Sequence, residues 1–295
     1  MQLLASHRRM AWCLNAFWVV LAGLVYASSA NAHAPTLVQA PAPQTSPKTA
    51  PDKCLAFASR EMPGMGRIHR AALKPNQVKL TYVHHSTFVI ESPKGVTVAT
   101  DYNDYYRPAA LPQIVTMNLA HDTHHTMTPD PGIKHVLKGW NDQGGTAAIH
   151  DLTVQDVRIR NVPTNIRTYG TDAVQHGNSI FVFEVAGLCI AHLGHLHHTL
   201  TVQHLAQLGQ MDVVMIPVDG SFTLDVPGTI EVLKALKAPL IIPMHYFSEY
   251  TLGRFLDAAG KIFDVARLDA SELMLARDQL PAKQKVVVLP PGGGR

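Results

Sequence analysis

The chain of 295 residues has few cysteines, no basic stripe and no apolar run of membrane-spanning length. Its 25 Lys and Arg residues exceed its 22 Asp and Glu residues only slightly, and the basic residues are scattered. We therefore expect no nucleic-acid partner. The three cysteines form no C-x-x-C pair, which excludes a zinc ribbon. The apolar content of 46 % is nevertheless enough for a sizeable core.

The first 32 residues have the pattern of an export signal. Basic Arg8 and Arg9 precede the apolar stretch 10–26, which is short for a spanning helix. Ala30-Asn31-Ala32 then forms a small-x-small cleavage site. We expect residues 1–32 to be a signal peptide, and the mature chain to be periplasmic or secreted, with no membrane association after cleavage. An uncleaved membrane anchor is the alternative.

Two cysteines lie beyond this signal, Cys54 and Cys189. An oxidising compartment would permit them to pair, but Cys189 lies in a strand-like run where a buried free cysteine is also ordinary. Both alternatives stay open. Residues 33–66 are predicted to be a Pro/Ala-rich linker and N-terminal extension, with a short helix over residues 54–60. Residues 67–295 are predicted to form one domain.

Strand patterns dominate the first half of this domain and alternate with helical patterns in the second half. The strands are predicted over residues 78–91, 96–100, 114–118, 135–140, two within 147–162, 179–184, 188–193, 212–218, 240–244 and 286–289. The helices are predicted over residues 200–208, 226–238 and 251–259. This order indicates an α/β (α+β) class, with two sheets packed back to back and helices outside. Side chains at the strand ends would then meet along one edge.

Histidine is the abundant residue, with 17 in the chain. Nine fall in three clusters: His84 and His85; His121, His124 and His125; and His192, His195, His197 and His198. Neutral imidazole suits Zn, Cu, Fe and Ni, and residues three or four apart share a face of a helical turn. Another histidine, His245, follows the apolar run 240–244. These positions predict a metal site, and a metal-free hydrogen-bonded network or a solvated loop is the alternative.

Several segments match short patterns of one known family, in the family's order. They are His84-His85-Ser86-Thr87-Phe88 with a hairpin to Asp101, Leu119 to His124 against H-x-H-x-D-H, Gly194-His195 against Gly-Asp, Asp212 to Pro217, and Pro243-Met244-His245. From Val78 onward the sequence therefore resembles the metallo-β-lactamase fold superfamily, and within it the branch of the L-ascorbate-6-phosphate lactonase, the zinc-dependent hydrolases of the β-lactamase fold. The resemblance implies a four-layer αββα sandwich.

The chain departs from that family at several ligand positions. Leu119 stands where the family has its first histidine, Thr123 where it has an aspartate, and His195 where it has the bridging aspartate. The histidine expected after the strand ending near Pro163 is missing, with Asn165 or Ile166 there instead. Two dications 4 Å apart repel by roughly 16 kcal/mol at an effective dielectric of 20. Without the bridging carboxylate, we expect one metal ion rather than two.

The residues and the resemblance together predict the composition of the site. The expected metal ligands are His121, His124, His195 and His245, with His192, His197 or His198 competing with His121 for the last position. The expected catalytic residues are His121, Asp122 and His198. Residues expected behind the ligands or against substrate are His85, Asp101, His192, His197 and Asp219, while His84 is expected to pack in the core. Zinc is the expected cofactor, with Mn or Fe as alternatives.

A three-histidine zinc with an open position is typical of a catalytic site. We therefore expect an exported metal-dependent hydrolase that acts on an ester, lactone or phosphoester through a metal-bound hydroxide. A small-molecule substrate is the expected partner. Tyr102 to Arg107 is expected to form a lid or a substrate contact, with a solvated surface loop as the alternative. The alternative is a non-catalytic metal- or small-ligand-binding protein on a degenerate metallo-β-lactamase fold.

Overall fold

The computed structural model describes Cys54 and residues 73–168 and 173–292. The chain divides into two units, residues 1–49 and 50–295, and every described residue belongs to the second. The predicted signal peptide, the linker and most of the predicted helix over residues 54–60 lie outside the described residues. Among the described residues, we find no helix with the length and apolarity needed to cross a membrane.

The first sheet has six strands in the order β13-β1-β2-β3-β4-β5. Their bounds are β1 Gln77–His84, β2 Thr87–Glu91, β3 Thr97–Ala99, β4 Ile114–Met117, β5 His135–Lys138 and β13 Glu272–Ala276. In β1, buried Val78, Leu80 and Tyr82 alternate with half-buried neighbours, because successive side chains of a strand point to opposite faces. The strands β3, β4 and β5 pair in parallel, so the ends of β3 and β4 lie at the same edge.

The second sheet has eight strands in the order β12-β14-β11-β10-β9-β8-β7-β6. Their bounds are β6 Asp151–Val154, β7 Val157–Arg167, β8 Ala173–Val185, β9 Leu188–His192, β10 Val213–Pro217, β11 Leu240–Met244, β12 Asp264–Arg267 and β14 Lys285–Val288. All residues of β9, β10 and β11 are buried. These three strands are parallel to one another. Parallel strands that are covered on both faces have continuous apolar sequences, because both faces are buried.

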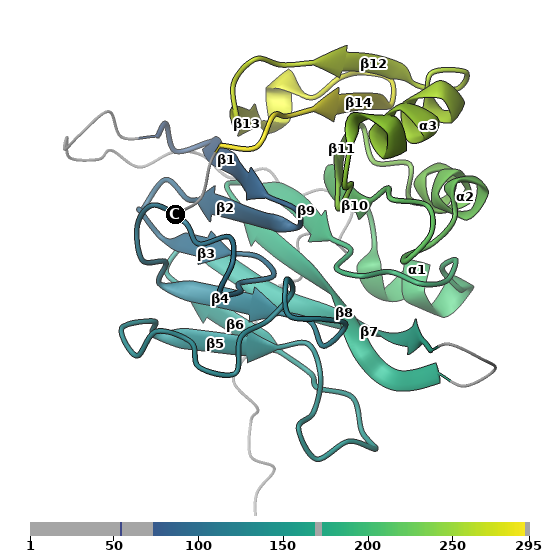
Figure 1. The fold of residues 1–295 in the computed structure, drawn as a ribbon. Helices are drawn as coiled ribbons and strands as arrows, with labels where there is room; N and C mark the ends of the chain where they lie inside the picture. The colour runs from purple at the N-terminus through teal and green to yellow at the C-terminus, as the bar shows by residue number, and fades with distance from the viewer. Residues whose placement is uncertain (1–53, 55–72, 169–172, 293–295) are drawn as a thin grey trace, which may run out of the picture. The chain divides into compact units, whose positions relative to one another are not determined.

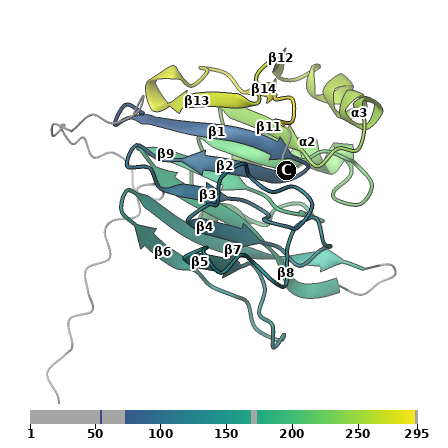
Figure 2. The same ribbon diagram turned by 60° about the vertical axis from the view of Figure 1, so that its left-hand side comes forward.

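The helices are α1 Val202–Leu208, α2 Val226–Leu236 and α3 Glu249–Ala259, with a short 3₁₀ helix, η1, at Arg277–Gln279. Leu233 of α2 and Phe255 of α3 pack on β10 and β11 in one core, on the outer face of the second sheet. A second core lies between the sheets and contains Phe88 of β2 and Phe183 of β8. The helices therefore gather on the side of β10 and β11 (Figures 1 and 2).

The outer face of the first sheet is covered by loops in the described part of the chain. A small core there contains Val115 and Met117 of β4, together with Tyr102, Ile133 and Trp140 from the loops and the end of β5. The predicted class of two sheets with helices outside is confirmed, and the outer layer on this side consists of loops rather than a helix. These loops carry two of the histidines considered below.

One predicted strand is wrong in detail. Residues 78–91 form a hairpin of β1 and β2 rather than one strand, with the turn at His85-Ser86. His85 has a φ of 53° there, a conformation that is uncommon outside glycine. The run contains no Gly, Pro or Asn to mark a turn, so its β-branched and aromatic residues predicted one continuous strand. The strands β12 and β13 were also missed. The residues of β12 are mostly exposed and show no apolar run, whereas β13 contains a short apolar run, Leu273 to Ala276, that was not assigned to a strand.

Cys54 and Cys189 form a disulfide, which decides between the two alternatives that the sequence left open. It joins residues that are 135 apart in the chain, with a Cα–Cα distance of 6.0 Å. Both cysteines are buried, and Cys189 lies in β9. The bond therefore links Cys54 to the strand that leads to His192 and His195.

Candidate metal centre

Functional side chains gather at one edge of the two sheets, where several strands end. Asp101 follows β3, and His121 and His124 lie in the loop after β4. From the second sheet, His195 follows β9 and His245 directly follows β11. Because parallel strands present their carboxyl ends at the same edge, segments distant in the sequence deliver their side chains to one place.

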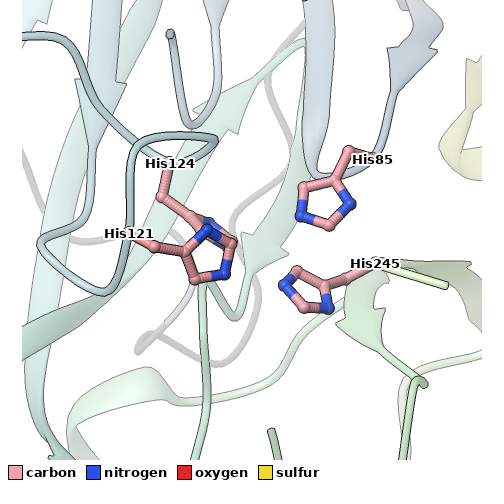
Figure 3. A group of neighbouring side chains, drawn as sticks. All are labelled: His85, His121, His124 and His245. Carbon is pink, nitrogen blue, oxygen red and sulfur yellow. The ribbon is translucent and has the colours of Figure 1, made fainter. Parts of the chain in front are cut away.

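Four imidazoles form the centre of this edge: His85, His121, His124 and His245. One ring nitrogen from each lies within 4.8 Å of the corresponding nitrogens of the others. Figure 3 shows the four rings turned toward one another, with His121 and His124 on one side and His85 and His245 on the other. Within the described part of the chain, the Nε2 atoms of His85, His124 and His245 are buried and have no hydrogen-bond partner.

His124 is held by a buried carboxylate. Its Nδ1 lies 2.5 Å from Asp101 Oδ2, and both side chains are fully buried. Asn118 donates to the other carboxylate oxygen of Asp101 at 2.9 Å, which fixes the carboxylate plane. A neutral His124 then donates its Nδ1 proton to Asp101, and the Nε2 lone pair points into the cluster. Histidine ligands of metals are usually oriented in this way.

His245 is held by the same kind of pair. Its Nδ1 lies 3.1 Å from Asp219 Oδ1, and both side chains are fully buried. Asp219 also accepts hydrogen bonds from the backbone N–H groups of Ser221 and Phe222, at 2.9 and 2.6 Å, and from the Thr223 hydroxyl. Burial alone would raise the pKa of Asp219, but the bonds from His245 and Thr223 hold it well below the usual range. The carboxylate is therefore ionised and fixes His245.

His85 reaches the cluster because the β1–β2 turn is tied to the second sheet. The carbonyl of His85 accepts from the backbone N–H of His245 at 2.7 Å and from the Tyr82 hydroxyl at 2.9 Å. The next carbonyl, that of Ser86, lies 2.8 Å from His192 Nε2. His245 itself has a φ of 54°. Backbone strain of this kind is common at functional sites.

His195 approaches the group of four through His121. The two Nε2 atoms are 3.1 Å apart, which is close to the separation expected for two imidazoles bound to one ion at about 2.05 Å each. On their far sides, His121 Nδ1 lies 2.8 Å from the Thr123 hydroxyl, and His195 Nδ1 lies 2.6 Å from His197 Nε2. His195 is therefore positioned as a fifth imidazole beside the four.

Glycine is required just before His195. Gly194 has a φ of 58°, and a Cβ there would lie 2.4 Å from Asn178 Oδ1 and 2.5 Å from Asn118 Nδ2. Asn178 Oδ1 accepts the backbone N–H of His195 at 2.8 Å, while the Asn118 carboxamide supports Asp101. Any side chain at this position would displace the two amides that orient the site.

Burial keeps His85, His121, His124 and His195 neutral. It lowers the pKa of His85 to about 2, with a further contribution from the neighbouring imidazoles. It also lowers the pKa of His121, His124 and His195, because a low-dielectric surrounding disfavours the charged ring. Neutral rings keep their lone pairs at physiological pH, and a lone pair is what a metal ligand needs.

The donor set fits a transition metal. Four imidazoles converge with His195 beside them, and three of the four have a buried Nε2 without a hydrogen-bond partner among the described residues. Two of the four are oriented by buried carboxylates. Imidazole donors suit Zn, Cu, Fe and Ni, whereas Ca and Mg prefer oxygen donors. His85, His121, His124 and His245 are therefore the residues that could hold such an ion, with His195 in contact.

The structure brings most of the predicted site residues together. His121, His124 and His245 lie in the group of four, with His195 against His121. His85, expected behind the ligands, has its Nε2 in the group instead. The positions expected to support the ligands are filled as follows: Asp101 and Asp219 bind two of the rings, His197 binds His195, and His192 binds the turn of His85.

Of the predicted catalytic residues, Asp122 lies at the margin of the metal centre and His198 lies outside it. Asp122 is exposed, beside His121, and accepts a hydrogen bond from the Tyr105 hydroxyl at 2.8 Å. His198 faces away from the centre, with Nδ1 2.9 Å from the Thr199 carbonyl and Nε2 accepting from the Asn165 N–H at 3.2 Å. Both of its ring nitrogens are thus used by the backbone, and we correct the expectation that His198 acts in catalysis or competes as a ligand.

Sequence reasoning missed three polar residues that position the site. Asn118 and Asn178 were not singled out, because single asparagines near strand ends carry no pattern of their own. Thr123 was noted only as the replacement of an aspartate, yet its hydroxyl orients His121. His84, expected in the core, is half-buried and stacks on Tyr106 with ring centroids 4.2 Å apart.

Comparison with known proteins agrees with this geometry. Residues 79–245 match the family model described as the β-lactamase superfamily domain. A protein named metal-dependent hydrolase from Methanospirillum hungatei is 25 % identical over 244 residues, covering 73 % of this chain and 97 % of that protein. A like-named protein from Thermoplasma volcanium is 29 % identical over 104 residues, and this match spans 44 % of that protein.

A solved structure supports the same assignment. A Thermotoga maritima protein described as a candidate Zn-dependent hydrolase of the metallo-β-lactamase superfamily has a TM-score of 0.51 and 29 % identity, covering 72 % of this chain and 98 % of that one. These similarities confirm the predicted superfamily, and they leave the branch of the L-ascorbate-6-phosphate lactonase as an expectation.

Proposed function

The chain belongs to the β-lactamase superfamily of metal-dependent hydrolases, and we propose that it is an exported enzyme that cleaves an ester, lactone or phosphoester. Under this proposal one metal ion is held by imidazoles of the group His85, His121, His124 and His245, with one position left open for water. His195 lies against His121 and supports this group. Zinc is the proposed ion, since it accepts imidazole donors and supports hydrolysis without redox chemistry.

One observation carries the proposal. Three buried Nε2 atoms, of His85, His124 and His245, converge without a hydrogen-bond partner among the described residues. A buried polar atom left unpaired costs about 1–3 kcal/mol, and three at one place would be a heavy cost for a site that served packing alone. A bound cation removes that cost, which favours a metal site over a metal-free histidine network.

The residues around that ion have different roles in the proposed reaction. When bound, the ion supplies a more acidic water and an electrophile for a carbonyl or phosphoryl oxygen. Asp101 and Asp219 hold His124 and His245 in the tautomer whose Nε2 faces the cluster. Asp122 is exposed beside His121 and is the proposed proton acceptor for the attacking water.

The substrate classes and export rest on separate support. Carboxylic and phosphoric esters share a polarisable oxygen and a leaving alkoxide, so one site of this kind serves either class. Export is supported by the pattern of residues 1–32 and by the Cys54–Cys189 disulfide, because disulfides persist in oxidising compartments.

Metal analysis and a substrate panel test the proposal together. The protein is purified without a histidine tag, its metal content is measured, and hydrolysis of 4-nitrophenyl acetate, dihydrocoumarin and bis(4-nitrophenyl) phosphate is followed. We expect about one zinc per chain and turnover of at least one substrate. His124→Ala should abolish both, while His135→Ala, which removes a half-buried imidazole from the edge strand β5, should change neither.

Two outcomes would contradict the proposal. Stoichiometric metal without turnover across the panel would favour the non-catalytic binding protein. Turnover that survives in His124→Ala would place the chemistry elsewhere in the molecule.

A further inference from the structure

A cavity of about 290 Å³ lies next to the metal centre and is not part of it. It lies among the end of β1, the segment between β11 and α3, and the residues after β12 and β14. Its lining includes Tyr82, His84, Phe247, Leu268, Leu289 and Pro290. Aromatic and aliphatic side chains make up most of this wall, as in sites that bind small apolar groups.

Phe247 connects the cavity to the metal centre. Its ring lines the cavity and lies 5.4 Å from the His245 ring and 5.6 Å from the His85 ring, measured between centroids. The ring is half exposed, at 55 %, so one face is free to contact a ligand. His84 also lines the cavity, and its neighbour in the chain, His85, belongs to the metal centre.

Most polar groups of the cavity already have partners within the chain. The hydroxyls of Tyr82 and Tyr246 donate to the carbonyls of His85 and Leu289, and the Ser248 hydroxyl accepts from the Thr251 N–H. Arg267 and Glu249 pair with each other at 2.9 Å, and both side chains are exposed. The interior therefore offers a mostly apolar surface, and His84 Nδ1 is its one buried side-chain nitrogen without a hydrogen-bond partner among the described residues. Such a surface suits an uncharged carbon chain better than a phosphate or sugar.

We propose that this cavity binds the apolar acyl chain of the substrate, so that the enzyme prefers medium-chain or ring-bearing carboxylic esters and lactones. The inference rests on the proposed function, because it assigns the scissile carbonyl to the adjacent metal centre. Phe247 is then a residue that determines specificity, placed between the chain and the reacting group.

A series of 4-nitrophenyl esters tests the preference. Each methylene that the cavity buries should raise kcat/KM by about fourfold, so hexanoate should exceed acetate by roughly tenfold or more even if only half of its added methylenes enter. The gain should appear mainly in KM, because the chain binds alike in the ground state and the transition state. Equal kcat/KM for acetate, butyrate and hexanoate would overturn the proposal.

Leu268→Trp supplies the blocking variant. It should reduce the ratio of kcat/KM for hexanoate to kcat/KM for acetate to within about threefold, since a filled cavity excludes the added methylenes. Leu280→Trp is the matched control, because Leu280 and Leu268 both line a second cavity of about 240 Å³ that contains no residue of the metal centre. Leu268→Ala, which enlarges the cavity, should shift the preference toward octanoate.

A binding measurement separates this inference from the proposed function. Saturation-transfer NMR with hexan-1-ol should show binding to the wild type and to Leu280→Trp, and loss of binding in Leu268→Trp. If no ester is hydrolysed but hexan-1-ol binding is as expected in all three proteins, the proposed function is wrong and the assignment of the cavity as an apolar binding site is retained. Loss of hexan-1-ol binding in Leu280→Trp instead would place the alcohol in the second cavity and overturn the inference.

Discussion

Replacing Asp219 by Asn tests how the protein holds His245 as a ligand. Asp219 Oδ2 accepts three backbone N–H groups, those of Ser221, Phe222 and Thr223. An asparagine would turn its oxygen toward these donors, and its NH₂ group would then face His245 Nδ1. Two donors cannot share that contact, so His245 would move its proton to Nε2. The nitrogen that faces the cluster would lose its lone pair.

The expected loss of affinity follows from this change of tautomer. Outer partners of metal-binding histidines typically contribute 10–100-fold to metal affinity, which corresponds to about 1.4–2.7 kcal/mol. The full burial of both side chains places the effect at the upper end, because no water can replace the carboxylate. We therefore expect zinc to bind roughly 100-fold more weakly to Asp219→Asn.

Competition with a fluorescent zinc chelator measures this affinity directly. Urea unfolding of the metal-free proteins shows in parallel whether the variant is folded. Asp122→Asn is the matched control, since Asp122 carries the same charge near the same cluster but is exposed and accepts from the Tyr105 hydroxyl. Its zinc affinity should stay within about twofold of the wild type, as expected for a screened surface charge.

The result that refutes the reasoning is specific. A folded Asp219→Asn protein with the zinc affinity of the wild type would mean that His245 is not a ligand or that its tautomer does not matter. An equal loss in Asp122→Asn would mean that net charge, rather than the buried pair, controls binding.

Three further predictions concern His85, the disulfide and acid stability. His85→Ala should weaken zinc binding by more than the roughly 100-fold expected for an outer partner, measured by the same competition, and an unchanged affinity would exclude His85 as a ligand. Reduction of Cys54–Cys189 should lower the free energy of unfolding by about 5 kcal/mol, since the bond closes a loop of 135 residues; urea titration with and without dithiothreitol measures this, and two titratable thiols in the oxidised protein would contradict it. The pKa values of His85 and His197, lowered to about 2 and about 4, make the metal-free protein lose stability below pH 6.5, because the unfolded chain takes up protons that the folded chain does not. Two such groups contribute about 3 kcal/mol between pH 7.5 and 5.5, and equal urea midpoints at these pH values would refute the account.

Much of the fold was predictable because its signals are local. The buried parallel strands β10 and β11 are continuous apolar runs, and α2 begins at Asp225, whose side chain caps the helix. The hairpin between β1 and β2 was not predictable in this way. Its turn depends on a non-glycine residue with positive φ, His85, and contacts with the second sheet, rather than a local turn signal, stabilise it.

The sequence by itself determined the superfamily, most of the order of the elements and the three histidines His121, His124 and His245. Each of these follows from a strand end or a short motif, which needs only neighbours in the chain. Tertiary structure decided which further imidazoles join them. His85 joins the metal centre because the second sheet binds the carbonyls of His85 and Ser86 in the β1–β2 turn. His198 does not join it, because its ring is hydrogen-bonded to the backbone instead. Such choices depend on hydrogen bonds between segments far apart in sequence, and no local pattern encodes them.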